Sequence, residues 1–365
     1  MKILHIINSM KMGGGQSLLV ELAPLQVKKG HKVSILELMP AKDKTLINKV
    51  EAGGVEVFSL KGIKSFYSPT NIFKIIPYLK HYDIVHVHLF PAQYWVGLAK
   101  LISGSKTPII TTEHSTKNKR RGKGIFKVVD PFIYNRYEEV VACADKALET
   151  FKACYPKVRA ISIPNGVNIK KYSDAESYSK QKLAGIKEDT FVATMVARFI
   201  PSKRQDTLVE AISLLPNKYH AVLVGGQPND EGLLKIKNLA KQLNVSDRIH
   251  FLYLRGDVPQ ILKSSDVIVM SSEYEGLSLS SIEGMAGGKP FIASDVNGLR
   301  EVVAGAGVLV RCGDAQQLAT EIEKLSENKD YYSEVATKCM ERASHYDIQD
   351  VAQKYLNEYK RFVEK

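Results

Sequence analysis

Residues 271–290 read Ser-Ser-Glu-Tyr-Glu-Gly-Leu-Ser-Leu-Ser-Ser-Ile-Glu-Gly-Met-Ala-Gly-Gly-Lys-Pro. The apolar run at 266–270 before them predicts a buried strand, and the glycines at 287 and 288 with Pro290 predict the end of a helix. A strand, a glycine turn and a helix start together favour anion binding, because free backbone N–H groups and the helix dipole attract negative charge. We expect Ser278, Ser280 and Ser281 to face the anion.

Two carboxylates flank this turn. Glu275 lies in the turn and Glu283 is eight residues further on, which is about 12 Å of rise if all of the segment is helical. They are too far apart to act as one acid/base pair, but they could bind two ends of a long ligand. Carboxylates accept hydrogen bonds from hydroxyls, so a nucleoside diphosphate sugar fits this pattern. The alternative is a surface turn with an exposed glutamate before a capped helix.

The segment 275–290, with Ala-Ser-Asp-Val-Asn-Gly-Leu-Arg-Glu-Val-Val at 293–303, resembles the signature of the family 4 retaining glycosyltransferases, the group 1 transferases. The resemblance implies an α/β fold called GT-B, in which two Rossmann-like doubly wound parallel-sheet domains face each other across a cleft. It also implies that Glu283 binds the ribose of the donor and Glu275 the hydroxyls of its sugar. The donor contacts that it implies between them are Gly276, Leu277, Ser278 and Leu279.

Apolar strand runs alternate with helical stretches along the whole chain, which is typical of parallel doubly wound sheets. We expect strands near 3–7, 32–38, 55–59, 84–88, 109–112, 139–142 and 160–163, and again near 191–197, 220–224, 248–251, 267–270, 291–293 and 307–310. The turn-rich segment 164–168 separates the two series. The sequence therefore predicts an acceptor-binding domain at 1–166 and a donor-binding domain at 167–347. The resemblance adds a C-terminal helix, about 348–365, that crosses back onto the first domain.

The charge is unevenly distributed. Of the formal net charge of +12, residues 1–165 carry an excess of 13, with 25 Lys and Arg against 12 Asp and Glu. A basic half indicates an anionic partner such as nucleic acid, a membrane surface or a phosphorylated lipid. No apolar run of eighteen residues exists, so no transmembrane helix is expected. The four cysteines have neither disulfide nor metal spacing, which favours a reducing cytoplasm.

Glycines 13–15 follow the first expected strand and open a helix. Glycine lets a backbone approach a bound phosphate or sugar closely, so Gly14 and Gly15 are candidate donor contacts. The spacing matches neither a dinucleotide fingerprint nor a phosphate loop. A plain strand-to-helix turn is the alternative. Gln16 stands where the resembled family usually has an acidic residue.

Three histidines lie at the ends of expected strands. His86 and His88 are two residues apart, hence on one face of a strand, and we expect one or both to line the cleft. No cysteine or carboxylate stands at ligand spacing nearby, so no metal is expected. His114 ends the next strand at the carboxyl edge, where ligands of such sheets bind. The family resemblance implies that His114 contacts the donor sugar and stabilises the transition state.

Two segments of the first half could meet an anionic surface. Residues 117–127 carry six basic side chains and no acidic one, including Lys119, Arg120, Arg121 and Lys123. We expect them to bind an anionic acceptor or a lipid head group, although a solvated basic loop would look the same. Residues 66–80 combine aromatic, aliphatic and lysine side chains, which fits either an interfacial helix or a helix packed on the sheet.

A second pair of cations marks the first strand-to-helix turn of the second domain. Arg198 leaves the expected strand and Lys203 is expected to begin the helix. Two cations at a helix N-terminus are favourable only where an anion outweighs their repulsion. The stretch resembles the Arg and Lys element with which the family binds the donor diphosphate. The resemblance also makes Tyr253 and Leu254 candidate contacts of the nucleobase.

The chemistry implied is transfer of a glycosyl group from a UDP- or GDP-linked sugar to a glycan or lipid-linked acceptor. No nucleophile–base pair emerges, so stabilisation of the leaving diphosphate carries the reaction. The expected catalytic residues are His114, Arg198, Lys203 and Glu275, and the family resemblance implies retention without a cofactor or metal. We expect a cytoplasmic enzyme, peripherally associated with the inner face of the plasma membrane. A nucleotide-sugar epimerase or a phosphorylase of the same fold stays open, whereas nucleic-acid binding is disfavoured because no aromatic platform is recognisable.

Overall fold

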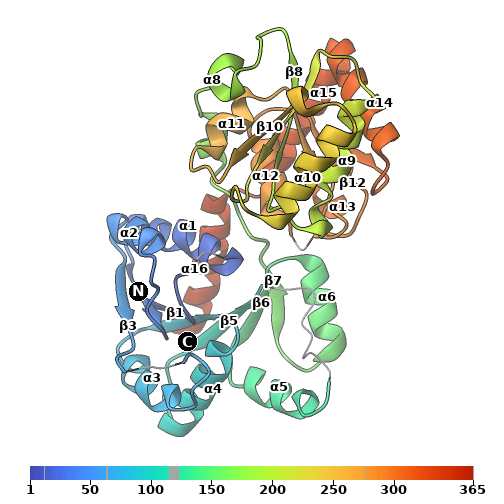
Figure 1. The fold of residues 1–365 in the computed structure, drawn as a ribbon. Coiled ribbons are helices and arrows are strands. Elements are labelled where there is room, and N and C mark those ends of the chain that lie inside the picture. The colour runs from blue at the N-terminus through green and yellow to red at the C-terminus, as the bar shows by residue number, and fades with distance from the viewer. Residues whose placement is uncertain (12, 63–64, 115–122, 276, 365) are drawn as a thin grey trace. The chain divides into compact units, whose positions relative to one another are not determined.

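The structure is a computed structural model that describes residues 1–11, 13–62, 65–114, 123–275 and 277–364. The chain divides into two compact units (Figure 1). Unit 1 comprises Met1–Gly166 with Ile348–Lys365, and unit 2 comprises Val167–Asp347. Each predicted strand run forms a strand whose ends lie within two residues of the expected ones. The prediction of two doubly wound parallel-sheet domains is confirmed.

Unit 1 is built on a parallel sheet whose strand order is β3-β2-β1-β4-β5-β6-β7. Its strands are β1 (Lys2–Ile7), β2 (Lys32–Glu37), β3 (Glu56–Ser59), β4 (Ile84–His88), β5 (Ile109–Glu113), β6 (Glu139–Ala142) and β7 (Ala160–Ser162). Its helices are α1 (Gly14–Lys28), α2 (Thr45–Ala52), α3 (Asn71–Leu79), α4 (Ala92–Ser103), α5 (Phe126–Tyr134), α6 (Asp145–Cys154) and α16 (Ile348–Val363).

Both faces of this sheet are buried, which explains why its strands are apolar runs rather than alternating patterns. On β1, Ile3 and Ile7 pack in one core with residues of α1, α2 and α16. Leu4 and Ile6 point to the other face and pack with residues of α3 and α4. Helix α16 therefore forms part of the layer over β1 and β4, next to α1 (Figure 1).

Unit 2 has a parallel sheet with the strand order β10-β9-β8-β11-β12-β13. Its strands are β8 (Phe191–Val196), β9 (Tyr219–Val224), β10 (Ile249–Tyr253), β11 (Val267–Met270), β12 (Phe291–Ser294) and β13 (Val308–Val310). Its helices are α7 (Ile169–Ser173), α8 (Lys180–Ala184), α9 (Gln205–Ser213), α10 (Glu231–Gln242), α11 (Val258–Ser264), α12 (Leu279–Ala286), α13 (Arg300–Val303), α14 (Ala315–Glu327) and α15 (Lys329–Ser344), with 3-10 turns η1 (Pro201–Lys203) and η2 (Ser246–Arg248). The described helices are not long and apolar enough to cross a membrane.

The order of each sheet reverses once, between β1 and β4 in unit 1 and between β8 and β11 in unit 2. Open α/β sheets bind ligands outside the carboxyl ends of the strands at such a reversal. The loops that follow β8 and β11 contain Arg198, Lys203 and Glu275. His114 follows β5, the neighbour of β4.

Helix α12 packs so closely on the sheet that it needs a glycine. A Cβ on Gly284 would lie 2.6 Å from Cε2 of Phe291 and 3.0 Å from Cγ2 of Ile268. We expect Gly284→Ala to lower the free energy of unfolding by about 1–3 kcal/mol, because the core has no room for the methyl group. Urea unfolding followed by circular dichroism measures this.

The matched control is Gly287→Ala at the end of the same helix. A Cβ there would meet its nearest neighbour, the carbonyl oxygen of Gly284, at 3.4 Å, which is ordinary contact. The stability should change by less than about 0.5 kcal/mol. Equal unfolding midpoints for the two variants would contradict this account of the packing.

Candidate active site

The loop after β8 carries both predicted cations of unit 2. Arg198 is exposed, and its carbonyl oxygen accepts a hydrogen bond of 2.9 Å from Nε2 of Gln205. Lys203 ends the 3-10 turn η1, and Arg204 follows with a φ of 51°, in the left-handed region. Helix α9 consequently begins at Gln205, so the prediction that Lys203 begins the helix is wrong by two residues.

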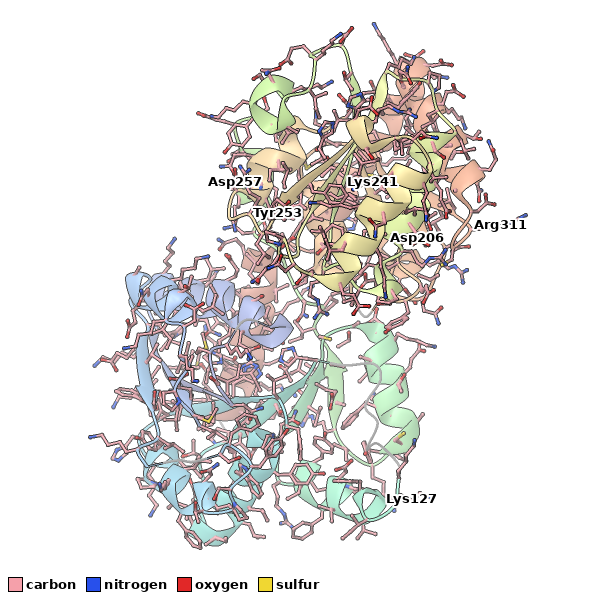
Figure 2. The ribbon with its side chains drawn as sticks, in the orientation of Figure 1. Lys127, Asp206, Lys241, Tyr253, Asp257 and Arg311 are labelled. Atoms are coloured by element: carbon pink, nitrogen blue, oxygen red, sulfur yellow. The ribbon has the colours of Figure 1, made fainter. Side chains whose placement is uncertain are left out.

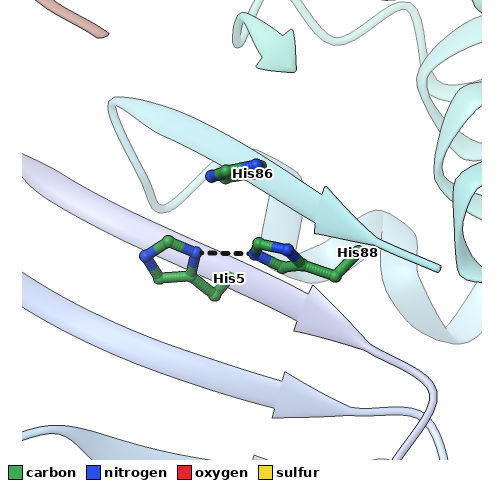
Figure 3. A group of neighbouring side chains, drawn as sticks. All are labelled: His5, His86 and His88. Carbon is green, nitrogen blue, oxygen red and sulfur yellow. Dashed lines mark hydrogen bonds between the residues drawn. The ribbon is translucent and has the colours of Figure 1, made fainter. Parts of the chain in front are cut away.

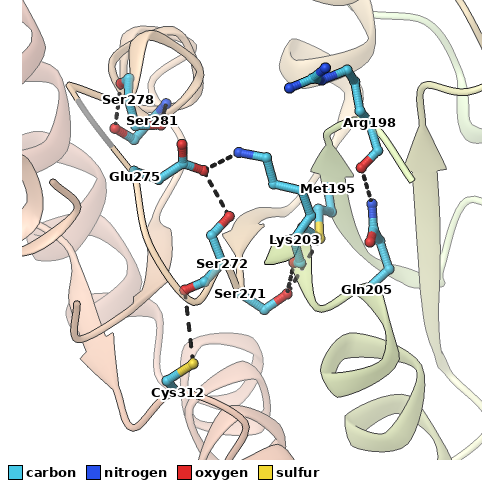
Figure 4. Close-up of polar contacts among 10 residues, drawn as sticks. All are labelled: Met195, Arg198, Lys203, Gln205, Ser271, Ser272, Glu275, Ser278, Ser281 and Cys312. Carbon is cyan, nitrogen blue, oxygen red and sulfur yellow. Dashed lines mark hydrogen bonds and ion pairs between the residues drawn. The ribbon is translucent and has the colours of Figure 1, made fainter. Parts of the chain in front are cut away.

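The loop after β11 meets this first loop through an ion pair. The ammonium group of Lys203 contacts Oε1 of Glu275, and both side chains are largely buried (Figure 4). The same oxygen accepts a hydrogen bond of 2.8 Å from the hydroxyl of Ser272. Ser271 donates its hydroxyl to the carbonyl oxygen of Arg204 at 2.6 Å. Lys203, predicted to bind the diphosphate, and Glu275, predicted to bind the sugar, are therefore in direct contact, although 72 residues separate them in the sequence.

An ammonium group has three N–H donors, so the pairing of Lys203 with Glu275 does not exhaust it. The carboxylate of Glu275 likewise keeps acceptor capacity on Oε2. The ion pair therefore orients both groups and leaves each with hydrogen-bonding capacity.

Helix α12 begins as predicted. Ser278 is the N-cap residue, and its hydroxyl accepts a hydrogen bond of 3.3 Å from the backbone N–H of Ser281. Ser281 is buried, and its hydroxyl donates to the carbonyl oxygen of Ser278 at 2.7 Å. The hydroxyls of both residues thus stabilise the helix end. The hydroxyl of Ser278 accepts in this cap and keeps its own O–H as a donor, so the expectation that Ser278, Ser280 and Ser281 face an anion stays a prediction. Capping by a serine favours helix formation by about 1 kcal/mol.

The remaining donor candidates of this segment lie along the same turn and helix. Leu277 and Leu279 are partly buried and pack against the core of unit 2. Glu283 lies further along α12 and is half-buried. Gly276 lies outside the described residues.

A pocket of about 940 Å³ opens beside the β8 loop. Arg198 and Leu254 line it, together with the turn after β9 that contains Gly226. Lys203 and Glu275 are not among its lining residues. Leu254 is two-thirds exposed, as expected for a side chain that is available to stack on a ligand.

Tyr253, the last residue of β10, has a φ of 51°. Its carbonyl oxygen accepts a hydrogen bond of 2.7 Å from the N–H of Gly225, and its hydroxyl accepts one of 3.0 Å from the ammonium group of Lys237. Its position next to α10 is visible in Figure 2. The left-handed backbone of Tyr253 changes the direction of the chain just before Leu254, which lines the pocket. Tyr253 therefore affects the pocket through its backbone.

In unit 1, the glycine turn after β1 lies against His114. A Cβ on Gly15 would stand 3.3 Å from Nε2 of His114, whereas one on Gly14 would have no neighbour within 4 Å. Burial lowers the pKa of His114 to about 4, so its imidazole is neutral at pH 7. Nδ1 of this ring is buried and has no hydrogen-bond partner in the described part of the chain.

The expectation that His86 or His88 lines a cleft is wrong. Both are completely buried on the face of the sheet that α1 and α16 cover. His5 lies beside them because the register pairs it with His86 across β1 and β4. One nitrogen from each of these three rings lies within 4.8 Å of the others, a spacing that a metal ion could use. Sequence reasoning missed His5, since only the strand order brings it to the other two.

The basic segment of unit 1 is described only in part. Lys119, Arg120 and Arg121 lie outside the described residues, while Lys123 is exposed. In the segment 66–80, Ile72, Ile75 and Leu79 of α3 pack in the core, so that helix is packed on the domain.

Two parallel doubly wound α/β units, each with candidate residues after strands at or next to the point where the sheet order reverses, define the GT-B fold. The fold is shared with solved structures. The crystal structure of Anabaena Alr3699/HepE in complex with UDP matches with a TM-score of 0.81 at 22% identity, covering 99% of this chain and all of that chain.

Models of two protein families match the chain. The model described as Glycosyltransferase Family 4 matches residues 12–171, and the one described as Glycosyl transferases group 1 matches residues 178–345. The chain belongs to the family 4, group 1 glycosyltransferases, as its motifs predicted.

Two similar proteins are named for transfer to acceptors linked to diphosphoundecaprenol. The UDP-Gal:alpha-D-GlcNAc-diphosphoundecaprenol alpha-1,3-galactosyltransferase of Escherichia coli is 28% identical over 345 residues, which cover 85% of this chain and 87% of that protein. The N,N'-diacetylbacillosaminyl-diphospho-undecaprenol alpha-1,3-N-acetylgalactosaminyltransferase of Campylobacter jejuni is 27% identical over 244 residues, which cover 65% of this chain and 62% of that protein.

The ion pair of Lys203 and Glu275 should couple the two loops energetically. In a double-mutant cycle with Lys203→Met and Glu275→Gln, we expect a coupling free energy of about 1–2 kcal/mol in urea unfolding, because each single variant leaves a largely buried charge without its partner. The control cycle uses Glu334 and Lys338, an exposed pair on α15, and should give a much smaller value. Additive effects of the Lys203 and Glu275 substitutions would contradict the coupling.

Proposed function

We propose that this glycosyltransferase moves a sugar from a UDP- or GDP-linked donor to a glycan or lipid-linked acceptor in cell-envelope polysaccharide synthesis, with retention of the anomeric configuration and no metal or cofactor. The observation that carries the proposal is the meeting of Lys203 and Glu275 at the reversal of the sheet in unit 2, with Arg198 on the same loop. A cation for phosphate and a carboxylate for hydroxyls are the two groups that a nucleotide sugar requires.

The comparisons support the choice of donor and acceptor. HepE, which shares the fold, has been crystallised with UDP and with UDP-glucose. The Escherichia coli relative uses UDP-galactose and a diphosphoundecaprenol-linked acceptor, according to its name. A lipid-linked acceptor also agrees with the basic charge of residues 1–165.

In the reaction, the bond between the anomeric carbon and the β-phosphate oxygen breaks and the acceptor hydroxyl oxygen bonds to the same carbon. The acceptor proton passes to the departing phosphate oxygen, so the products are the glycoside and the nucleoside diphosphate. Negative charge grows on the leaving diphosphate, and Arg198 and Lys203 would neutralise it. Neutral His114 would contribute a hydrogen bond, because burial keeps its pKa far below 7.

Removing Arg198 tests this assignment. We expect Arg198→Ala to lower kcat by more than a hundredfold, corresponding to about 3 kcal/mol of lost stabilisation, in assays with a panel of UDP- and GDP-sugars and lipid-linked acceptors. Lys241→Ala is the charge-matched control, because Lys241 is an exposed lysine on α10 outside the pocket lining (Figure 2). Equal activities of the two variants would show that Arg198 has no part in stabilising the leaving group.

The stereochemistry is a separate prediction. Neither the sequence nor the described site offers a nucleophile–base pair for double displacement, and the family resemblance implies attack of the acceptor on the face that the leaving group departs from. Proton NMR of the product formed in the first turnovers should show the anomeric configuration of the donor sugar. An inverted product would refute retention.

A third prediction concerns the membrane. Ile125, the N-cap residue of α5, and Val128 and Phe132 on that helix are exposed, while the opposite face packs in the core of unit 1. Exposed Lys123 and Lys127 flank this apolar row, and Lys127 is labelled in Figure 2. An exposed apolar row with lysines beside it suits the interface of an anionic bilayer.

We expect the double substitution Ile125→Ser and Val128→Ser to weaken sedimentation with anionic liposomes by at least tenfold, because two apolar side chains no longer enter the interface. Leu234→Ser on α10 of unit 2, also an exposed apolar residue, is the control and should bind as the native chain does. If the double variant and the Leu234→Ser control bind the liposomes equally at low salt, α5 is not the membrane contact.

A further inference from the structure

A continuous series of hydrogen bonds runs through the interior of unit 1 to His114. Nε2 of His5 lies 2.8 Å from Oε1 of Gln26, and Nδ1 of His5 lies 3.1 Å from Nε2 of His88 (Figure 3). Nδ1 of His88 lies 3.3 Å from Nε2 of His114. We call Gln26, His5, His88 and His114 the histidine relay. It connects helix α1, β1, β4 and the end of β5.

The rings of the relay are neutral. His5 and His88 are completely buried, whereas His114 is partly buried with its Nδ1 inaccessible to solvent. Burial lowers the pKa of His5 and His114 to about 4 and the pKa of His88 well below its usual value. Neutral imidazole has one nitrogen that donates and one that accepts. In a chain of such rings, the orientation of the first hydrogen bond therefore sets the orientation of all the others.

Gln26 sets that orientation. Its carbonyl oxygen can only accept, so His5 carries its proton on Nε2 and accepts on Nδ1 from Nε2–H of His88. His88 then accepts on Nδ1 from Nε2–H of His114. The proton of His114 is thereby placed on Nε2, and Nδ1 keeps its lone pair.

A second branch holds Gln26 in this orientation. The amide nitrogen of Gln26 lies 3.4 Å from the hydroxyl of Tyr359, and that hydroxyl lies 2.6 Å from Nδ1 of His86. The amide nitrogen can only donate, so the hydroxyl oxygen of Tyr359 accepts from it, and the proton of that hydroxyl is free to be donated to Nδ1 of His86. Nε2–H of His86 donates to the hydroxyl of Thr112 at 2.7 Å. Helix α16, which supplies Tyr359, thus contributes to the proton arrangement at His114.

The relay ends at an unused acceptor. Nδ1 of His114 is buried and has no partner among the residues described. A buried acceptor without a hydrogen bond costs about 1–3 kcal/mol. A ligand that donates a hydrogen bond to Nδ1 removes this cost, which adds to its binding free energy. A sugar hydroxyl is such a donor, whereas a phosphate oxygen is not.

We propose that the relay fixes His114 as the Nε2–H tautomer and presents Nδ1 as an acceptor for a hydroxyl of the bound sugar. Gln26, His5 and His88 are positioning residues that act through His114. The sugar contact rests on the proposed function, whereas the tautomer itself does not.

The same geometry disfavours a resident metal. His5, His86 and His88 are close enough to share an ion, but Nδ1 and Nε2 of each ring already lie within 3.3 Å of a hydrogen-bond partner. An ion would have to displace these bonds. Elemental analysis of the purified chain should find no stoichiometric zinc, and zinc that His5→Gln removes would overturn the relay.

The direct test is nuclear magnetic resonance of the full chain labelled with ¹⁵N in histidine. His114, assigned by loss of its signals in His114→Asn, should be neutral at pH 7 with the proton on Nε2. A proton on Nδ1 of His114 would overturn the proposal. This measurement needs no donor or acceptor, so it stands apart from any failure to find glycosyl transfer.

The functional test compares two substitutions of His88. His88→Asn keeps an acceptor, Oδ1, near the place of Nδ1, whereas His88→Phe keeps a ring without an acceptor. We expect His88→Phe to lower kcat/KM for the donor sugar at least tenfold while UDP alone binds as before, and His88→Asn to retain activity within about threefold. Equal losses in both variants, or a larger loss in His88→Asn, with equal Tm, would show that the acceptor at residue 88 has no part in positioning His114.

Discussion

The contact between Lys203 and Glu275 is the interaction on which the candidate site of unit 2 depends. It joins the loop after β8 to the loop after β11, and both loops leave the sheet where its strand order reverses. Ser271 and Ser272 reinforce the junction by donating to Arg204 and Glu275. Because the two charged groups hold each other, neither needs to be ordered when a ligand arrives, and preorganised charge is what stabilises a departing diphosphate.

The candidate residues of the two units differ in charge. Unit 2 offers charged groups on loops, with Arg198 open to solvent and Lys203 held by a carboxylate. Unit 1 offers a neutral histidine whose pKa burial has lowered to about 4, backed by further neutral rings. Charge is suited to an anion, and an oriented neutral acceptor is suited to a hydroxyl.

The fold could be predicted from the sequence because buried parallel strands are short apolar runs that stand out between helical segments. The segment 271–290 likewise indicated its turn and helix, since both depend on local residues. Lys203 was expected at a helix start because nothing local signals that Arg204 adopts a left-handed backbone. The role of His5 could not be predicted from the sequence, because it depends on the register between β1 and β4. It also depends on the contact between Gln26 and Tyr359, which are 333 residues apart.

A crystal structure of the chain with UDP tests the central claim most directly. The account predicts the diphosphate within hydrogen-bond distance, about 2.7–3.2 Å, of the guanidinium of Arg198 and the ammonium of Lys203, with the ion pair to Glu275 retained. UDP bound elsewhere, with both cations directed away from it, would contradict the account.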